Sequence, residues 1–191
     1  MKSLINKIQD IDVHIAFYMT HFYKHHLTNE IMKFISMCGD FGMSWLIVIL
    51  ITNMIDQTRT MSIDMLIALI AATLIGQVTI KSIVRRKRPC HTYPEVQLLI
   101  TTPSDLSFPS GHTGNAACAL LLGVLPVICQ KLKGKENLLF FIGVIFTLTV
   151  AFSRIIVGAH FLTDVTIGMS VTFLIEVIFV YKLWKKDNDS I

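Results

Sequence analysis

The chain has 191 residues, of which 53% are hydrophobic and only 16% are charged, and its formal net charge is +4. A soluble domain of this length rarely carries so little charge, so the composition argues against a soluble enzyme and predicts an integral membrane protein. A transmembrane helix needs about 20 apolar residues, which leaves room for several spans and for little else. We therefore expect one domain over residues 1–191 with an all-α fold, a polytopic membrane bundle of five or six transmembrane helices.

The first segment, residues 4–26, has apolar side chains at helical spacing on one side and polar side chains on the rest of its surface. This pattern predicts an amphipathic helix that lies in the membrane interface and precedes the bundle. An unusually polar first span is the alternative interpretation.

Five hydrophobic runs follow this helix, and each is predicted to cross the membrane. The first run is short unless residues from Ile31 onward contribute to it. A polar, proline-containing stretch between the second and third runs, residues 81–109, is predicted to be a loop. The runs cover residues 41–55, 61–80, 111–129, 138–152 and 161–184.

Three polar clusters fall at the ends of these runs. One follows the second run, one begins the third, and one joins the fourth run to the fifth. Because consecutive spans run in opposite directions, all three clusters are expected on the same side of the membrane. The sequence therefore predicts a single site at one face, built from residues 81–89, 108–112 and 153–164.

Three cations in these clusters are suited to a phosphoryl group, whose transfer is catalysed by positioning and by positive charge around its oxygens. Lys81 and Arg88 are seven residues apart, which on a helix would place them on one face, about 10 Å apart along the axis. Arg154 would add a planar fork for bidentate phosphate binding. Cations can also serve only to anchor helix ends among lipid headgroups. We assign that anchoring role to Arg85, Arg86 and Lys87.

The third run begins with Ser110 and Gly111. Backbone amides at the start of a helix lack partners and bind anions readily. Glycine allows a ligand to approach the backbone closely, and the Ser110 hydroxyl is a further donor. Ordinary capping of a helix is the alternative interpretation when this segment is considered alone.

His160 and Asp164 are four residues apart, a spacing at which side chains meet on a helix. We expect an Asp164 oxygen within about 3.2 Å of a His160 ring nitrogen, which would fix the tautomer and leave the other nitrogen free to act as a nucleophile. His112, on a different helix, would act as general acid. The remaining histidines are interpreted as interfacial residues: His14, His21, His25, His26 and His91.

Taken together, the three clusters resemble the signature motifs of the type 2 phosphatidic acid phosphatase family, also called the lipid phosphate phosphatases. The resemblance runs from Lys81 to Asp164, and all three motifs are intact and in order. They read Lys81-x6-Arg88-Pro89, Pro109-Ser110-Gly111-His112 and Ser153-Arg154-x5-His160-x3-Asp164.

This resemblance implies a role for each residue of the site. His160 would form a phosphohistidine that water then hydrolyses, Asp164 would orient His160, and His112 would protonate the leaving group. The phosphoryl oxygens would be held by Lys81, Arg88, Ser110, Gly111 and Arg154. Glu176, inside the fifth run, is left out of the site.

No cofactor and no metal are implied. The acidic residues near the motifs, Asp105 and Asp164, do not form the carboxylate cluster that magnesium prefers. The four cysteines are scattered, and neither a disulfide framework nor a zinc site is expected.

The expected partners are the bilayer and a membrane lipid phosphate, with no nucleic acid. Compact relatives of this kind make undecaprenyl pyrophosphate the favoured substrate, while phosphatidylglycerol phosphate and phosphatidic acid stay open. Basic residues are balanced between the two faces, and the resemblance places the site on the extracytoplasmic face of the cell membrane. Two rival functions are a lipid phosphotransferase with the same histidine nucleophile and a non-catalytic lipid-binding or transport protein.

Overall fold

The computed structural model describes residues 2–22, 26–39, 43–54, 59–117 and 134–188. Within these segments the regular elements are helices, with no strand, in agreement with the all-α prediction. In chain order they are α1 (Lys2–Phe22), α2 (His26–Cys38), α3 (Met43–Asn53), α4 (Arg59–Thr73), the π-helix η3 (Leu74–Ile80), α5 (Lys81–Val84), α6 (Pro89–Thr92), α7 (Gly111–Ala117), α9 (Glu136–Ile156) and α10 (Leu162–Asn188).

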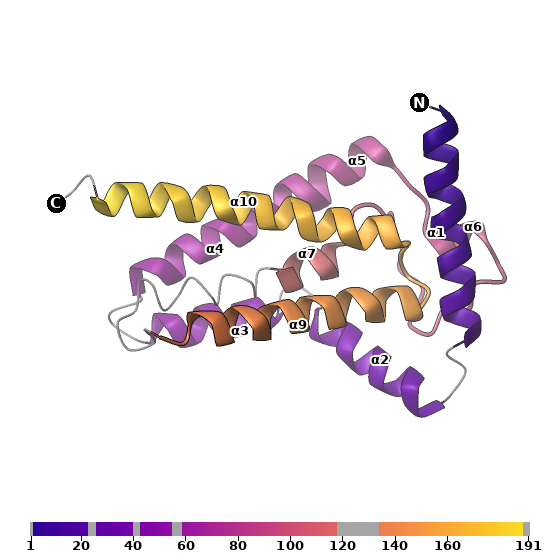
Figure 1. Cartoon of the computed structure of the whole chain (residues 1–191), viewed down its shortest axis with the longest axis horizontal. Helices are drawn as coiled ribbons and strands as arrows, with labels where there is room; N and C mark the ends of the chain where they lie inside the picture. Colours follow the sequence, from indigo (N-terminus) through magenta and orange to yellow (C-terminus); the bar gives the residue numbers. More distant parts are fainter. Residues whose placement is uncertain (1, 23–25, 40–42, 55–58, 118–133, 189–191) are drawn as a thin grey trace.

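The long helices lie side by side around the short helix α7 (Figure 1). Helix α10 packs on α7 and on α4, and α9 packs on α7 and on α2. Helix α1 crosses the end of this arrangement, where α9 finishes and α10 begins (Figure 1). The connection between α9 and α10 therefore lies beside α1.

Helices α4, η3 and α5 form one continuous helical stretch that ends abruptly at Arg85. Arg85 has a left-handed backbone with φ of 51°, which is uncommon for a residue other than glycine. Arg88, with φ of −71° and ψ of 156°, is extended and begins α6. The prediction that Lys81 and Arg88 share a helix face is therefore wrong, because the helix stops after Val84 and the chain turns between the two cations. The predicted loop is likewise interrupted by α5 and α6.

The predicted N-terminal amphipathic helix corresponds to α1, and a separate helix, α2, follows it. Helix α1 is part of the fold, since Ala16 is buried in a cluster with Val96 and Phe161 and the polar side chain of Asp12 is only 1% exposed. A location of α1 in the membrane interface stays a prediction.

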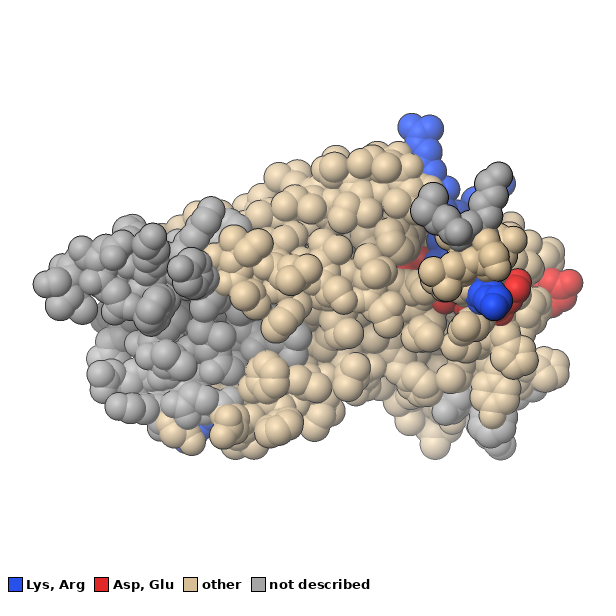
Figure 2. Space-filling model, turned by 45° about the horizontal axis from the view of Figure 1, so that its top comes forward, with Lys and Arg blue, Asp and Glu red and all other residues tan. Residues whose placement is uncertain are grey.

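Large hydrophobic side chains are exposed along α3, α4, η3, α9 and the described part of α10. Among the described residues, one helix is long and apolar enough to cross a membrane, Asn137–Ile156, with mean hydropathy 2.2, and a shorter apolar stretch covers Leu162–Ile175. Figure 2 shows an uncharged middle region on one face and charged side chains at the end beside α1. The number of spans stays a prediction, and most of the third predicted run, residues 118–129, lies outside the described residues.

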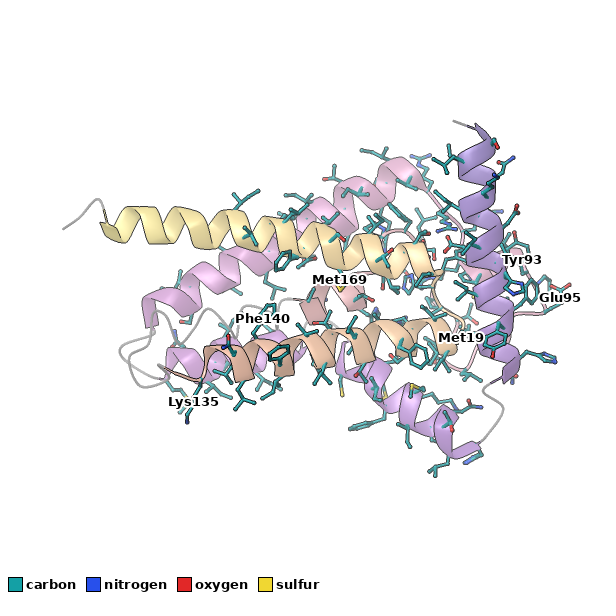
Figure 3. The ribbon with its side chains drawn as sticks, viewed as in Figure 1. Met19, Tyr93, Glu95, Lys135, Phe140 and Met169 are labelled. Atoms are coloured by element: carbon teal, nitrogen blue, oxygen red, sulfur yellow. The ribbon has the colours of Figure 1, made fainter. Side chains whose placement is uncertain are left out.

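The starts of α7 and α10 meet toward the end of the molecule beside α1. Figure 3 shows Tyr93 and Glu95 at the end beside α1, with Lys135 and Phe140 at the opposite end and Met169 between them. At the α1 end, α10 approaches the start of α7 so closely that a Cβ added to Gly168 would lie 2.5 Å from the Ser110 carbonyl oxygen. Glycine at position 168 thus brings the beginning of α10 against the beginning of α7.

Candidate active site

A cavity of about 370 Å³ at the α1 end collects side chains from distant parts of the chain. It is bounded on one side by α4 and η3 and on the other by α7 and the connection before α10. Five of the predicted site residues line it: Lys81, Arg88, Gly111, His112 and His160.

The other predicted residues lie around this cavity. Ser110 is fully buried, with its hydroxyl 3.1 Å from the hydroxyl of Thr113. Arg154 is also buried, donates to the Ser36 hydroxyl, and lines a second cavity of about 500 Å³. Both cavities include Arg88, Asp105 and His112 in their walls. The structure therefore brings the three sequence clusters to one place, while the side chain of Glu176 lies outside the described residues.

His160 is oriented by contacts on both ring nitrogens. Its Nε2 lies 2.9 Å from Nη1 of Arg88, and its Nδ1 lies 3.4 Å from the Ser107 hydroxyl and 3.6 Å from Oδ2 of Asp164. A guanidinium can only donate hydrogen bonds, so Nε2 must accept, and the ring proton of neutral His160 belongs on Nδ1. The geometry thus gives His160 a lone pair on the nitrogen that faces Arg88 and the cavity.

The same residue is held in its neutral form. His160 is only 1% exposed, and this burial lowers its pKa to about 3, with Arg88 and Arg154 acting in the same direction and Asp164 opposing them. At neutral pH the imidazole therefore keeps the unprotonated nitrogen that a nucleophile requires.

Asp164 is a buried carboxylate with several donors around it. Its Oδ2 accepts from the Ser107 hydroxyl and from the Phe161 amide at 2.9 Å, and its Oδ1 accepts from Arg86 at 2.7 Å. The Phe161 bond is of the capping-box kind, in which an acidic residue in the first turn reaches back to the amide before the helix. Asp164 thereby fixes the start of α10.

Two details of the predicted His160–Asp164 pair are wrong. His160 precedes α10, which begins at Leu162, so the two residues do not share a helix. Their closest approach is 3.6 Å, longer than the expected hydrogen bond, because the Ser107 hydroxyl and the Phe161 amide already engage Oδ2. Ser107, which sequence reasoning missed, stands between the two functional groups.

The prediction that Arg86 anchors a helix end among lipid headgroups is also wrong. Its Nη1 donates to Asp164 at 2.7 Å and to the Thr163 hydroxyl at 2.6 Å, and its Nη2 donates to Asp12 and Gln9, each at 2.7 Å. The guanidinium also lies 4.1 Å above the ring of Phe161. Arg86 therefore joins α1 to the carboxylate that faces His160.

Asp12 completes this network from the N-terminal helix. Its Oδ1 accepts from the Thr163 amide at 3.0 Å, and its Oδ2 accepts from the Thr163 hydroxyl and from Arg86. We name the buried set formed by Arg86, Asp12, Thr163 and Asp164 the inner network. A polar residue on the buried side of an amphipathic helix was the one available signal for Asp12, and no pattern linked it to a cation 74 positions away.

Asp105 is the second acidic residue that sequence reasoning left without a role in the site. Its Oδ2 lies 2.6 Å from Nζ of Lys81 and its Oδ1 lies 2.6 Å from Nη2 of Arg88. Burial opposes its ionisation, but the hydrogen bonds and charges of Lys81 and Arg88 hold its pKa well below the usual range. Asp105 is thus a permanent anion between two predicted phosphate-binding cations.

The described residues contain no group of three or more histidine, cysteine or acidic side chains placed to hold a metal ion. Among them, Cys38 and Cys90 are free thiols, and Cys118 and Cys129 lie outside the described ranges. Lys81, Arg88 and Arg154 place positive charge in the walls of the two cavities.

Comparison with known proteins identifies the family. Residues 62–188 match the family model described as PAP2 superfamily. Solved structures also resemble the chain. One, titled as the first transmembrane PAP2 type phosphatidylglycerolphosphate phosphatase from Bacillus subtilis, has a TM-score of 0.78, 26% identity, and coverage of 97% of this chain and 88% of that one. Aquifex aeolicus LpxE shares the fold, with a TM-score of 0.69, 22% identity, and coverage of 86% and 92%.

Curated relatives match over shorter segments. The chain is 38% identical over 94 residues to a decaprenylphosphoryl-5-phosphoribose phosphatase of Mycobacterium tuberculosis, covering 49% of this chain and 45% of that protein. It is 29% identical over 140 residues to an undecaprenyl-diphosphatase of Sulfolobus acidocaldarius, covering 73% and 63%. Each match thus spans less than two thirds of the relative. Because the family model covers more than half of this chain, the chain belongs to the PAP2 superfamily.

Proposed function

We propose that this member of the PAP2 superfamily is a multi-pass membrane enzyme that hydrolyses a phosphomonoester or diphosphate on a membrane lipid, with His160 as the nucleophile. One observation carries the proposal. The Nε2 atom of His160 carries a lone pair at a cavity that Lys81, Arg88 and His112 also line, while Nδ1 faces the buried carboxylate of Asp164.

In the proposed reaction, Nε2 of His160 attacks the phosphorus atom. A nitrogen–phosphorus bond forms, the bond from phosphorus to the leaving oxygen breaks, and His112 gives that oxygen a proton. Asp164 and Ser107 face the Nδ1 proton and stabilise the positive charge that develops on the ring. Water then attacks the phosphorus atom, and His112 accepts a proton from the water. The nitrogen–phosphorus bond breaks, its electron pair returns to Nε2 of His160, and inorganic phosphate is released.

In this scheme Arg88 donates hydrogen bonds to different acceptors before and after the substrate binds. Without substrate, its Nη1 donates to Nε2 of His160 and to the Ala159 carbonyl oxygen. When a phosphoryl group binds, the proton directed at Nε2 can turn to a phosphoryl oxygen, which exposes the lone pair for attack. Lys81, Arg154, Gly111 and Ser110 would hold the remaining oxygens, as charge-assisted donors suit a group that gains negative charge.

The favoured substrate is undecaprenyl pyrophosphate, and phosphatidylglycerol phosphate and phosphatidic acid are further candidates. The relatives support this class, since they include an undecaprenyl-diphosphatase and a phosphatidylglycerophosphatase B of Bacillus subtilis, the latter 42% identical over 80 residues. The apolar outer faces of the long helices suit a lipid whose tail stays in the bilayer. We place the site at the extracytoplasmic face.

The test uses the purified full chain in detergent with undecaprenyl pyrophosphate as the sole substrate, an excess of chelator, and no acceptor. We expect inorganic phosphate to be released, and release to be lost in His160→Ala but kept in His91→Ala, which changes an exposed histidine. Turnover that requires an added lipid or sugar acceptor would instead support a phosphotransferase. Activity that disappears with chelator and returns with magnesium or zinc would contradict the metal-free mechanism.

A further inference from the structure

We propose that Asp105 is a resident competing anion of the phosphate site. Its carboxylate occupies Lys81 and Arg88 in the substrate-free enzyme, the phosphoryl group of the substrate displaces it, and it returns to these cations as inorganic phosphate leaves. The inference rests on the proposed function, because it requires Lys81 and Arg88 to bind phosphoryl oxygens.

The contacts of Asp105 imitate those of a bound phosphate. One carboxylate oxygen meets Lys81 and the other meets Arg88, each at 2.6 Å, as two oxygens of one phosphoryl group would. The backbone carbonyl oxygen of Asp105 also accepts from Nε of Arg88 at 3.0 Å. The carboxylate therefore uses the same donors that the substrate would need.

Exposure separates the fixed members of this set from the movable one. The side chains of Lys81 and Arg88 are 11% and 2% exposed, whereas that of Asp105 is 52% exposed. Asp105 lies in the non-helical connection between α6 and α7. Arg88 is held further by the Ala159 carbonyl oxygen at 2.9 Å. The cations are thus set in the protein, while the carboxylate can turn into water at little desolvation cost.

Asp105 also lies where the two cavities of the site meet. It is part of the wall of both cavities, together with Arg88 and His112. One cavity contains His160 and the other contains Arg154, so a phosphoryl group that contacts both residues must lie between them. Departure of the Asp105 carboxylate from this position would leave Lys81 and Arg88 facing that phosphoryl group.

A competing anion has a defined thermodynamic effect. Any phosphate that fully displaces Asp105 loses the same free energy, so its dissociation constant rises by a common factor and the ratio between ligands does not change. Charge-assisted hydrogen bonds are strong enough for this factor to be roughly tenfold or more. Product phosphate then leaves more easily, and a phosphodiester headgroup that uses the same donors binds more weakly by the same factor.

The experiment compares Asp105→Asn with Glu95→Gln in the full chain in detergent. Each variant removes one negative charge from the same connection, and Glu95 is an exposed residue on its outer part (Figure 3). The dissociation constant of inorganic phosphate is measured by calorimetry, which requires no turnover. We expect it to fall about tenfold in Asp105→Asn and to stay at the wild-type value in Glu95→Gln. An unchanged or weaker affinity in Asp105→Asn would overturn the proposal.

A second measurement uses the wild-type chain, in case Asp105→Asn does not fold. A structure of the wild-type chain is determined with saturating inorganic phosphate. The Asp105 carboxylate should have left Nζ of Lys81 and Nη2 of Arg88, with phosphate oxygens in its place, whereas a bound phosphate with both Asp105 contacts kept at 2.6 Å would overturn the proposal. Turnover is assayed separately, so that a chain which binds phosphate as described but hydrolyses no lipid phosphate would refute the proposed function and leave the competing anion standing.

Discussion

Arg86 and Arg88 are two residues apart, and both form ion pairs with aspartates at the site. The aspartates of the two arginines differ in how far they are exposed to water. Arg86 holds Asp164 and Asp12, whose side chains are 0% and 1% exposed. Arg88 holds Asp105, whose side chain is 52% exposed. We call the second arrangement, formed by Lys81, Arg88 and Asp105, the outer cluster.

This difference separates a scaffold from a binding site. Removing one partner of a buried ion pair leaves an uncompensated charge and typically destabilises a protein by about 3–5 kcal/mol, so the inner network has no exchangeable member. In the outer cluster the Asp105 carboxylate reaches water, and another anion can replace it. The inner network should therefore control the rate of the chemical step, and the outer cluster should control phosphate affinity.

The largest difference between the inner network and the outer cluster is expected in the effect of Arg86→Lys on kcat. Lysine keeps the charge but cannot reach Asp164, Asp12 and Thr163 with one planar fork. We expect kcat to fall about 10- to 100-fold, with the dissociation constant of inorganic phosphate unchanged because Lys81 and Arg88 are untouched. Steady-state kinetics and calorimetry on the purified protein measure the two quantities.

Arg85→Lys is the matched control, since Arg85 is the exposed neighbour and should tolerate the change. A variant Arg86→Lys that weakens phosphate binding while leaving kcat at the wild-type value would reverse the roles assigned to the two arrangements.

A second prediction concerns the neutral state in which burial holds His160. Its pKa in the folded state is about 3, against an ordinary value of 6.5. At pH 5 the unfolded chain takes up this proton and the folded chain does not, so stability falls as the pH drops from about 6.5 toward 3. The loss at pH 5 should be on the order of 2 kcal/mol relative to neutral pH.

The measurement is the pH dependence of the unfolding midpoint in detergent, for the wild type and for His160→Gln. Glutamine has no proton to take up, so the midpoint of the variant should fall less on going from pH 7.5 to pH 5. Parallel decreases in both proteins would show that His160 titrates normally.

The smallest effect is expected from Asp12→Asn, which loosens α1 from the inner network while Arg86 keeps its bond to Asp164. We expect kcat to fall by roughly threefold to tenfold, as for the loss of a single ordinary hydrogen bond, because asparagine can still accept from Arg86. Asp10→Asn, an exposed change on the same helix, should have no effect. If Asp12→Asn reduced kcat as far as Arg86→Lys, the orientation of Asp164 would depend on α1 itself.

The sequence predicted the convergence of the motifs because alternating spans leave few options for where Lys81, His112 and His160 meet. It did not predict which of the neighbouring cations points inward, because Arg85, Arg86 and Lys87 are three consecutive basic residues. Only the turn at Arg85 directs Arg86 to Asp164. The role of Asp12 could not be predicted because its partners, Arg86 and Thr163, are 74 and 151 positions away in the sequence. For Asp105 only metal binding could be weighed from the sequence, because its contacts with Lys81 and Arg88 join residues 24 and 17 positions apart.

The most direct measurement of the central claim is trapping of the phosphorylated enzyme. The wild-type chain is mixed with undecaprenyl pyrophosphate that carries a radiolabelled terminal phosphate, quenched rapidly in base, and mapped by peptide. The account predicts an acid-labile, base-stable label on the peptide that contains His160, and no label in His160→Ala. Steady release of phosphate without any label at His160, or with a label at another residue, would contradict it.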